Sequence, residues 1–141
     1  MSYRTIHQAI VDKLAATTAI TDLVSQINYA HTKFDSFPAI AVANSVNSND
    51  YQSTDSNKRT YSFSIFTYNL FKNNDEYEAA VKATEDVMDQ LIALFNVRSV
   101  LQPAALITMP VPSSLVTIEA GDEGVYIVGE VTVQCMVHEN C

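Results

Sequence analysis

Apolar residues in this chain change their spacing from every four positions to every second position and back, and this change constrains the fold more than any other feature. A four-residue spacing places apolar side chains on one stripe of a helix, and a two-residue spacing places them on one face of a strand. The first spacing predicts helices at residues 6–14, 18–24 and 75–96. The second predicts a short edge strand at 104–109 and longer strands at 39–46, 59–69, 115–120 and 125–137.

The order of these elements indicates an α+β fold. Strands in hairpin pairs, with the helices grouped apart from them, are typical of a mostly antiparallel sheet. We expect about four strands, one long helix packed on the sheet, and an N-terminal helix. The chain has 141 residues, of which 48% are apolar and 17% charged, so it is large and apolar enough for one core. We therefore expect residues 1–141 to form a single domain.

The long predicted helix carries a regular apolar stripe, which we expect to pack on the sheet. Asp75 followed three residues later by Glu78 is a capping-box pattern, and acidic residues suit the positive helix N-terminus. The acids at positions 85, 86 and 89 fall on the opposite side, where we expect solvent. The stripe residues predicted to lie in the core are Tyr77, Val81, Met88, Leu91 and Phe95.

A polar segment separates the first two predicted strands. Residues 47–58 contain neither Gly nor Pro and are too many for a tight hairpin turn, so we expect a protruding loop or arm at about residues 44–58. One hypothesis is that this segment binds a neighbouring subunit or a partner, and the alternative is a mobile, solvated loop. The candidate assembly residues are Asn47, Asp50, Tyr51, Asp55, Lys58 and Arg59.

The sequence lacks the patterns of common catalytic sites, so we expect no enzyme activity, cofactor or metal. The histidines at 7, 31 and 138 form no spaced ligand pair, and we expect each to be exposed or locally hydrogen-bonded. Three glycines are too few for a phosphate-binding loop. Cys135 lies in an alternating apolar run, which predicts a buried thiol, and we expect both it and Cys141 to be reduced.

The net charge of −8 is unevenly distributed along the chain. Basic and acidic residues nearly balance before residue 73, whereas no Lys or Arg follows Arg98. Tight binding of nucleic acid depends on Lys and Arg at the phosphates, so we expect none here. No apolar run reaches the length of a membrane span or a signal peptide, and we expect a soluble domain in the cytoplasm.

Three segments resemble the tail terminator (tail-completion) proteins of long-tailed bacteriophages. They are IHQAIVDKL at 6–14, AITDLV at 19–24 and FPAIAV at 37–42. Those proteins have an N-terminal helix, a short apolar segment and an aromatic–Pro–apolar strand in this order. The strand ending in Phe66-Thr67-Tyr68, the polar break, the long amphipathic helix and the closing hairpin also fit, so the resemblance extends from about residue 6 to residue 137.

The resemblance implies a structural protein of the virion, located at the junction of tail and neck and assembled in the host cytoplasm. Members of this family form a hexameric ring that caps the tail tube and stops its polymerisation. The implied partners are other copies of the chain, the tail tube protein and a neck or head-completion (stopper) protein. Genomic DNA would pass through the ring without sequence-specific binding, and the candidate acids lining the bore are Glu119, Asp122, Glu123 and Glu130.

Alternative functions remain open at this stage. Another head–tail connector or stopper protein of the phage neck would share the size, the charge and the ring. A small-ligand-binding or enzymatic α+β domain is a further alternative. For the acids, ordinary exposure to bulk water is the alternative to a bore, and a divalent-ion site at Asp122 and Glu123 is a weaker one.

Overall fold

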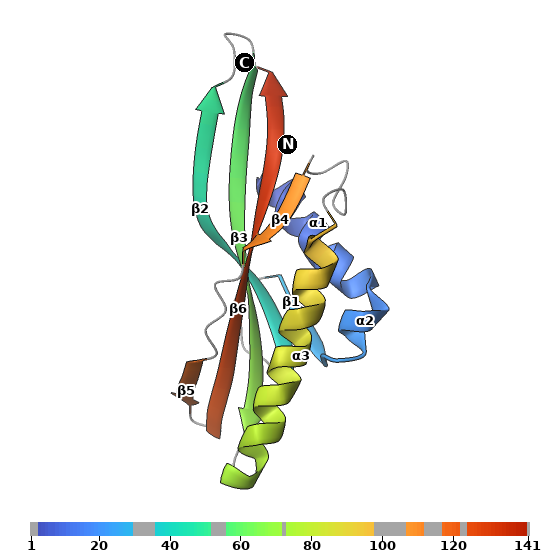
Figure 1. The fold of residues 1–141 in the computed structure, drawn as a ribbon, viewed down its shortest axis with the longest axis vertical. Coiled ribbons are helices and arrows are strands. Elements are labelled where there is room, and N and C mark those ends of the chain that lie inside the picture. The colour runs from blue at the N-terminus through green and yellow to red at the C-terminus, as the bar shows by residue number, and fades with distance from the viewer. Residues whose placement is uncertain are drawn as a thin grey trace.

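A computed structural model describes residues 3–29, 36–51, 56–71, 73–97, 107–111, 117–121 and 124–140 (Figure 1). The order of its elements agrees with the predicted succession of helices and strands and adds one short strand, β1. In chain order the elements are α1 (Tyr3–Ala16), α2 (Thr18–Thr21), β1 (Gln26–Asn28), β2 (Ala39–Tyr51), β3 (Ser56–Phe71), the 3-10 turn η1 (Asn74–Glu76), α3 (Tyr77–Phe95), β4 (Ile107–Val111), β5 (Thr117–Gly121) and β6 (Gly124–Asn140).

The described strands form one sheet in the order β1-β2-β3-β6-β4, and β5 pairs with β6 farther along the edge that β4 occupies. β1 is parallel to β2, and every other described pair is antiparallel. The predicted α+β fold, with a long helix on a mostly antiparallel sheet and an N-terminal helix, is confirmed. The described sheet has six strands rather than about four. The strand that the sequence missed, β1, has only three residues, too few to show a two-residue alternation.

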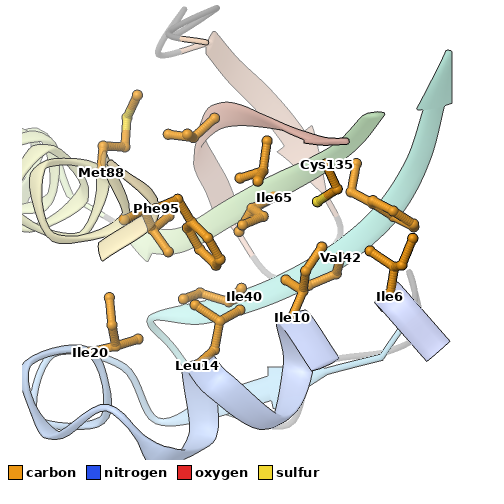
Figure 2. Packing of buried hydrophobic residues seen from close by; sticks show 14 of the residues in the cluster. Ile6, Ile10, Leu14, Ile20, Ile40, Val42, Ile65, Met88, Phe95 and Cys135 are labelled. Atoms are coloured by element: carbon orange, nitrogen blue, oxygen red, sulfur yellow. The ribbon is translucent and has the colours of Figure 1, made fainter. Parts of the chain in front are cut away.

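The helices lie on one side of the sheet, and their apolar stripes meet it in one main core (Figures 1 and 2). In α1 the buried residues Ile6, Ile10 and Leu14 follow the four-residue spacing that predicted the helix. Figure 2 shows them pointing toward Ile40 and Val42 of β2. The other fully buried large side chains of this core include Ile20, Phe63, Ile65, Val87, Leu91, Phe95, Val131 and Val133.

Helix α3 packs through most of its predicted stripe, but two details of the prediction are wrong. Tyr77, expected in the core, is 41% exposed because it is the first residue of α3 and lies at the end of the sheet. Its ring contacts that of Phe71, the last residue of β3, with 5.3 Å between ring centroids. The capping box is absent, since the turn η1 precedes the helix and Glu76, the N-cap residue, makes no side-chain cap. The buried residues of α3 are Ala80, Thr84, Val87, Met88, Leu91 and Phe95.

Helix α3 approaches the sheet closely at Gly129 of β6. A Cβ atom on Gly129 would lie 2.6 Å from the Sδ atom of Met88 and 2.8 Å from the Oγ1 atom of Thr67 on β3. Both distances are shorter than van der Waals contact, so the close packing of helix on sheet here requires glycine. The Oγ1 atom of Thr67 is buried and has no hydrogen-bond partner in the described structure.

We expect Gly129→Ala to lower the free energy of unfolding by about 1–3 kcal/mol, because the added methyl group overpacks the helix–sheet contact. Chemical denaturation measures this cost. Thr67→Ala removes one of the two obstructing atoms, so the cost of Gly129→Ala should be smaller in that background. An equal cost in both backgrounds would show that the contact with Thr67 is not its cause.

Candidate functional site

The polar segment predicted as a loop between residues 47 and 58 is largely sheet, and that part of the prediction is wrong. β2 continues to Tyr51 and β3 begins at Ser56, and the two remain paired as far as Tyr51 opposite Asn57. The segment has no alternation of apolar residues, which is why its sequence does not indicate a strand. β3 pairs with β2 on one side and with β6 on the other, so β3 is the central strand of a three-stranded ribbon.

We call this ribbon the arm and define it as residues 43–51 of β2, 56–62 of β3 and 134–140 of β6. In Figure 1 its three strands extend well beyond the C-terminal end of α3. A bulge in β2 between Asn44 and Asn47 separates the arm from the part of the sheet that carries the core. The predicted protrusion therefore exists, but as an extension of the sheet.

The arm brings together five of the six candidate assembly residues. Asp50, Lys58 and His138 occupy one row across β2, β3 and β6. In the next row toward the core, Arg59 lies between Asn49 and Val137. The remaining candidates in the arm are Asn47 and Tyr51, whereas Asp55 lies outside the described residues.

The base of the arm is anchored in the core by Tyr61 and Cys135, which lie opposite each other. Tyr61 is 6% exposed and Cys135 is fully buried, near Ile6 and Val42 (Figure 2). Burial raises the pKa of the Cys135 thiol to about 12, because the thiolate would lose its hydration. The predicted buried, free thiol is confirmed, and its raised pKa does not suit a nucleophile. Cys141 lies outside the described residues.

His7 joins α1 to the outer edge of β2. Its Nε2 atom lies 2.6 Å from the carbonyl oxygen of Tyr29 and 3.2 Å from that of Val42. Since carbonyl oxygens only accept hydrogen bonds, Nε2 is the donor to both. The imidazole also stacks on the ring of Tyr29, with 3.8 Å between centroids. The prediction of a locally hydrogen-bonded histidine is confirmed for His7; His138 lies in β6, and His31 lies outside the described residues.

Only two of the four candidate bore acids can be placed. Glu119 lies in β5 opposite Tyr126, and Glu130 lies in β6 opposite Phe66, where it is half-buried. Asp122 and Glu123 lie outside the described residues. The two placed acids are therefore on adjacent strands: Glu119 lies at the end of the sheet remote from the arm, and Glu130 lies between that end and the arm.

The described residues offer little that suits a metal or a substrate. No three His, Cys, Asp or Glu side chains among them gather as metal ligands would. A shallow cavity of about 290 Å³ between α1, α2 and β1 has no ionisable lining; its residues are Ala15, Thr21, Val24, Ser25, Gln26 and Ile27. Within the described ranges, no helix has the length and apolar character needed to cross a membrane.

No protein-family model matches the chain, and no curated protein matches its sequence. The features that bear on function are therefore the arm, the charge distribution and the resemblance found in the sequence.

The Cys135 thiol should be protected in the folded protein. In a Cys141→Ser variant at pH 8, we expect iodoacetamide to label Cys135 on the order of 1,000-fold more slowly than an ordinary thiol, since a pKa near 12 leaves little thiolate. Adding Ala93→Cys on the exposed face of α3 supplies a reactive thiol for comparison. Equal labelling rates of the two thiols would contradict the burial.

The same pKa gives the pH dependence of stability. The unfolded thiol titrates near pH ~8.5, below its folded pKa. The buried neutral thiol therefore makes its full contribution to the free energy of unfolding below pH ~8.5, and this contribution is lost as pH rises toward 12. Denaturation of the Cys135→Ala variant, which lacks this titration, is the control.

Proposed function

We propose that this protein is a structural component of a long-tailed bacteriophage. It caps the tail tube as a ring, ends tube polymerisation and joins the tail to the head or neck. The resemblance of residues 6–137 to tail terminator proteins supports this proposal in the sequence. The arm supports the proposal in the structure. This extension of the sheet is the observation that carries the proposal.

The arm is longer than the fold of a single chain requires. β6 has 17 residues and α3 has 19, so β6 is about 55 Å long and α3 about 28 Å at the usual rise per residue. α3 therefore covers only about half of the length of β6, and the core that includes α1 reaches as far as Cys135, so the last residues of β6 extend past the helices. Strands in globular proteins usually have about 5–6 residues, so β2, β3 and β6 are all unusually long. Such an extension suits contact with other chains.

A ring provides that contact by repetition. When one surface of a chain meets a different surface of the next copy and the rotation closes, identical contacts generate a ring. The two sides of the arm, one formed by β2 and the other by β6, supply two such different surfaces. Most residues of the core lie in the helices and in the part of the sheet below the bulge, and of the described side chains of the arm only Tyr61 and Cys135, at its base, belong to the core.

The mass of the assembly and its effect on tail tubes test the proposed function. We expect the purified protein to have about six times the 15.6 kDa mass of one chain, and to bind tube ends and stop growth when mixed with its tail tube protein. A protein that stays monomeric and leaves tube length unchanged would overturn the proposal. A ring that ignores tube ends but binds neck proteins would favour the connector or stopper alternative.

Shortening the arm tests its part in assembly. Replacing residues 49–59 by Asn-Gly joins Ser48 to Thr60, which are opposite each other in the sheet, through a two-residue hairpin turn. We expect this variant to fold, with a cooperative thermal transition, and to remain monomeric. Normal assembly of the folded variant would exclude the arm as an assembly element.

We also propose that the acids between residues 119 and 130 face the bore of the ring, because negative charge repels the phosphates of passing DNA. Combining Asp122→Lys, Glu123→Lys and Glu130→Lys should slow DNA ejection, most strongly at low salt where charges are less screened. The matched control makes the same change of charge on the exposed face of α3, at Glu85, Asp86 and Asp89. Equal ejection by both variants would leave the acids without a role in the bore.

A further inference from the structure

The outer edge of β2 in the arm has no partner strand among the described residues. β1 pairs with β2 only at Ala39–Ala41, and the next carbonyl, that of Val42, accepts the hydrogen bond from His7. Residues 43–51 then continue for about 30 Å as the outermost strand, as Figure 1 shows. An edge of this length presents a row of backbone donors and acceptors that another strand can pair with.

The register shows which backbone groups point outward along this edge. The Val42 carbonyl points away from β3, toward His7, so Asn44, two residues on, does the same. Asn44 is opposite Phe63, and after the bulge Asn47 is opposite Tyr61, two residues along β3. Along β2 the backbone groups alternate between pointing toward β3 and pointing outward, and the bulge shifts this alternation by one residue. The N–H and C=O groups that point outward in the arm are those of Asn47, Asn49 and Tyr51.

Natural proteins protect exposed edges with Pro, with Lys or with very short strands. The segment Ala43–Tyr51 contains no Pro, Lys or Arg, and its one acid is Asp50. The bulge protects only the base of the edge, because regular pairing resumes at Asn47. The five residues beyond the bulge are a regular strand edge that lacks these protective features.

On the opposite side of the arm, a second strand edge at the same level has no partner among the described residues. In the described part of the chain, β4 pairs with β6 as far as Met136, and β6 continues through Asn140. The backbone N–H and C=O groups of Tyr61 point away from β2 and toward Cys135, so those of Cys135 point toward β3. Because the direction alternates along a strand, the backbone groups of His138 and Asn140 point away from β3. The register places residues 49–51 of β2 in the same rows as residues 137–139 of β6.

We propose that these two edges pair with each other between copies of this chain. The outward groups of Asn47, Asn49 and Tyr51 in one copy bond to those of His138 and Asn140 in the next copy, and the sheet continues from subunit to subunit. β2 and β6 are both antiparallel to β3, so rotation about an axis along the arm brings them together as a parallel pair. A second copy is the occupant that supplies the missing strand to both edges at the same level, and a closed ring leaves neither edge open. This inference rests on the proposed ring and specifies how its subunits meet.

Proline substitution tests the pairing, because it removes one N–H group from an edge. Asn49→Pro and His138→Pro each delete a donor that points outward, and the ladder to β3 does not use it. Asn49→Ala and His138→Ala are the matched controls, since they change the side chain and keep the N–H. We expect each Pro variant to need about tenfold more protein to assemble than its Ala control, as measured by light scattering over a concentration series.

Hydrogen exchange tests the same pairing in the unmodified protein, so the result does not depend on how well a Pro variant folds. The amides of Asn47, Asn49, Tyr51, His138 and Asn140 should exchange slowly in the assembly and quickly after dilution to monomer. Equal assembly of the Pro and Ala variants, or unchanged exchange of these amides, would overturn the edge pairing. An effect at Asn49 without one at His138 would also overturn it, because β2 would then pair with itself about a two-fold axis. In each case a wild-type ring would still stand, whereas a monomeric wild type would refute the proposed function itself.

Discussion

The antiparallel ladder between β3 and β6 is the interaction on which the rest of this structure depends. It joins sixteen residues of β3, Ser56–Phe71, to residues 140–125 of β6 without a register shift. At one end the ladder presents the apolar face on which the helices pack, and at the other end it forms the middle of the arm. A one-residue slip would turn every core residue of one strand to the wrong face, so packing at the core also sets the rows of the arm.

The helices fix this register through contacts that tolerate little change. Gly129 lies where α3 meets β6, and the Sδ atom of Met88 occupies the space that a side chain would need. Farther along β6, Cys135 is buried near Ile6 of α1 (Figure 2). His7 closes the outer edge of β2 at Val42, immediately before the strand leaves the core. The place where the sheet stops being covered by its own chain is therefore defined by particular side chains.

This division gives the molecule its proposed function. The covered half of the sheet contains the core that folds the chain, while the arm has edges that a single chain leaves without described partners. The charge distribution adds a second asymmetry, since Lys58 and Arg59 lie in the arm and no Lys or Arg follows Arg98. A ring suits both the uncovered arm and the uneven charge. Rotation about the ring axis gives every chain the same orientation, so the same part of each chain faces the same way.

The sequence by itself determined the parts of the fold in which one face is buried. The spacing of Ile6, Ile10 and Leu14 predicted α1, and the alternation around Cys135 predicted a buried thiol in a strand. A buried face requires apolar residues at a regular spacing along a helix or strand, so a regular spacing of apolar residues in the sequence indicates a buried face. Tyr77 fits the helical period and is nonetheless exposed, because the period does not reveal where the sheet ends.

Only the tertiary structure decided the form of the arm and the short strand β1. Residues 47–51 have no apolar alternation, and they become a strand because β3, held in register by the core, offers them backbone partners. β1 forms in the same way, by pairing with the first residues of β2. Backbone hydrogen bonds between strands do not depend on which side chains are present, so a polar segment carries no local sign of them. The candidate residues of the arm were found from their polarity and position, but the edges that they line were defined by pairing alone.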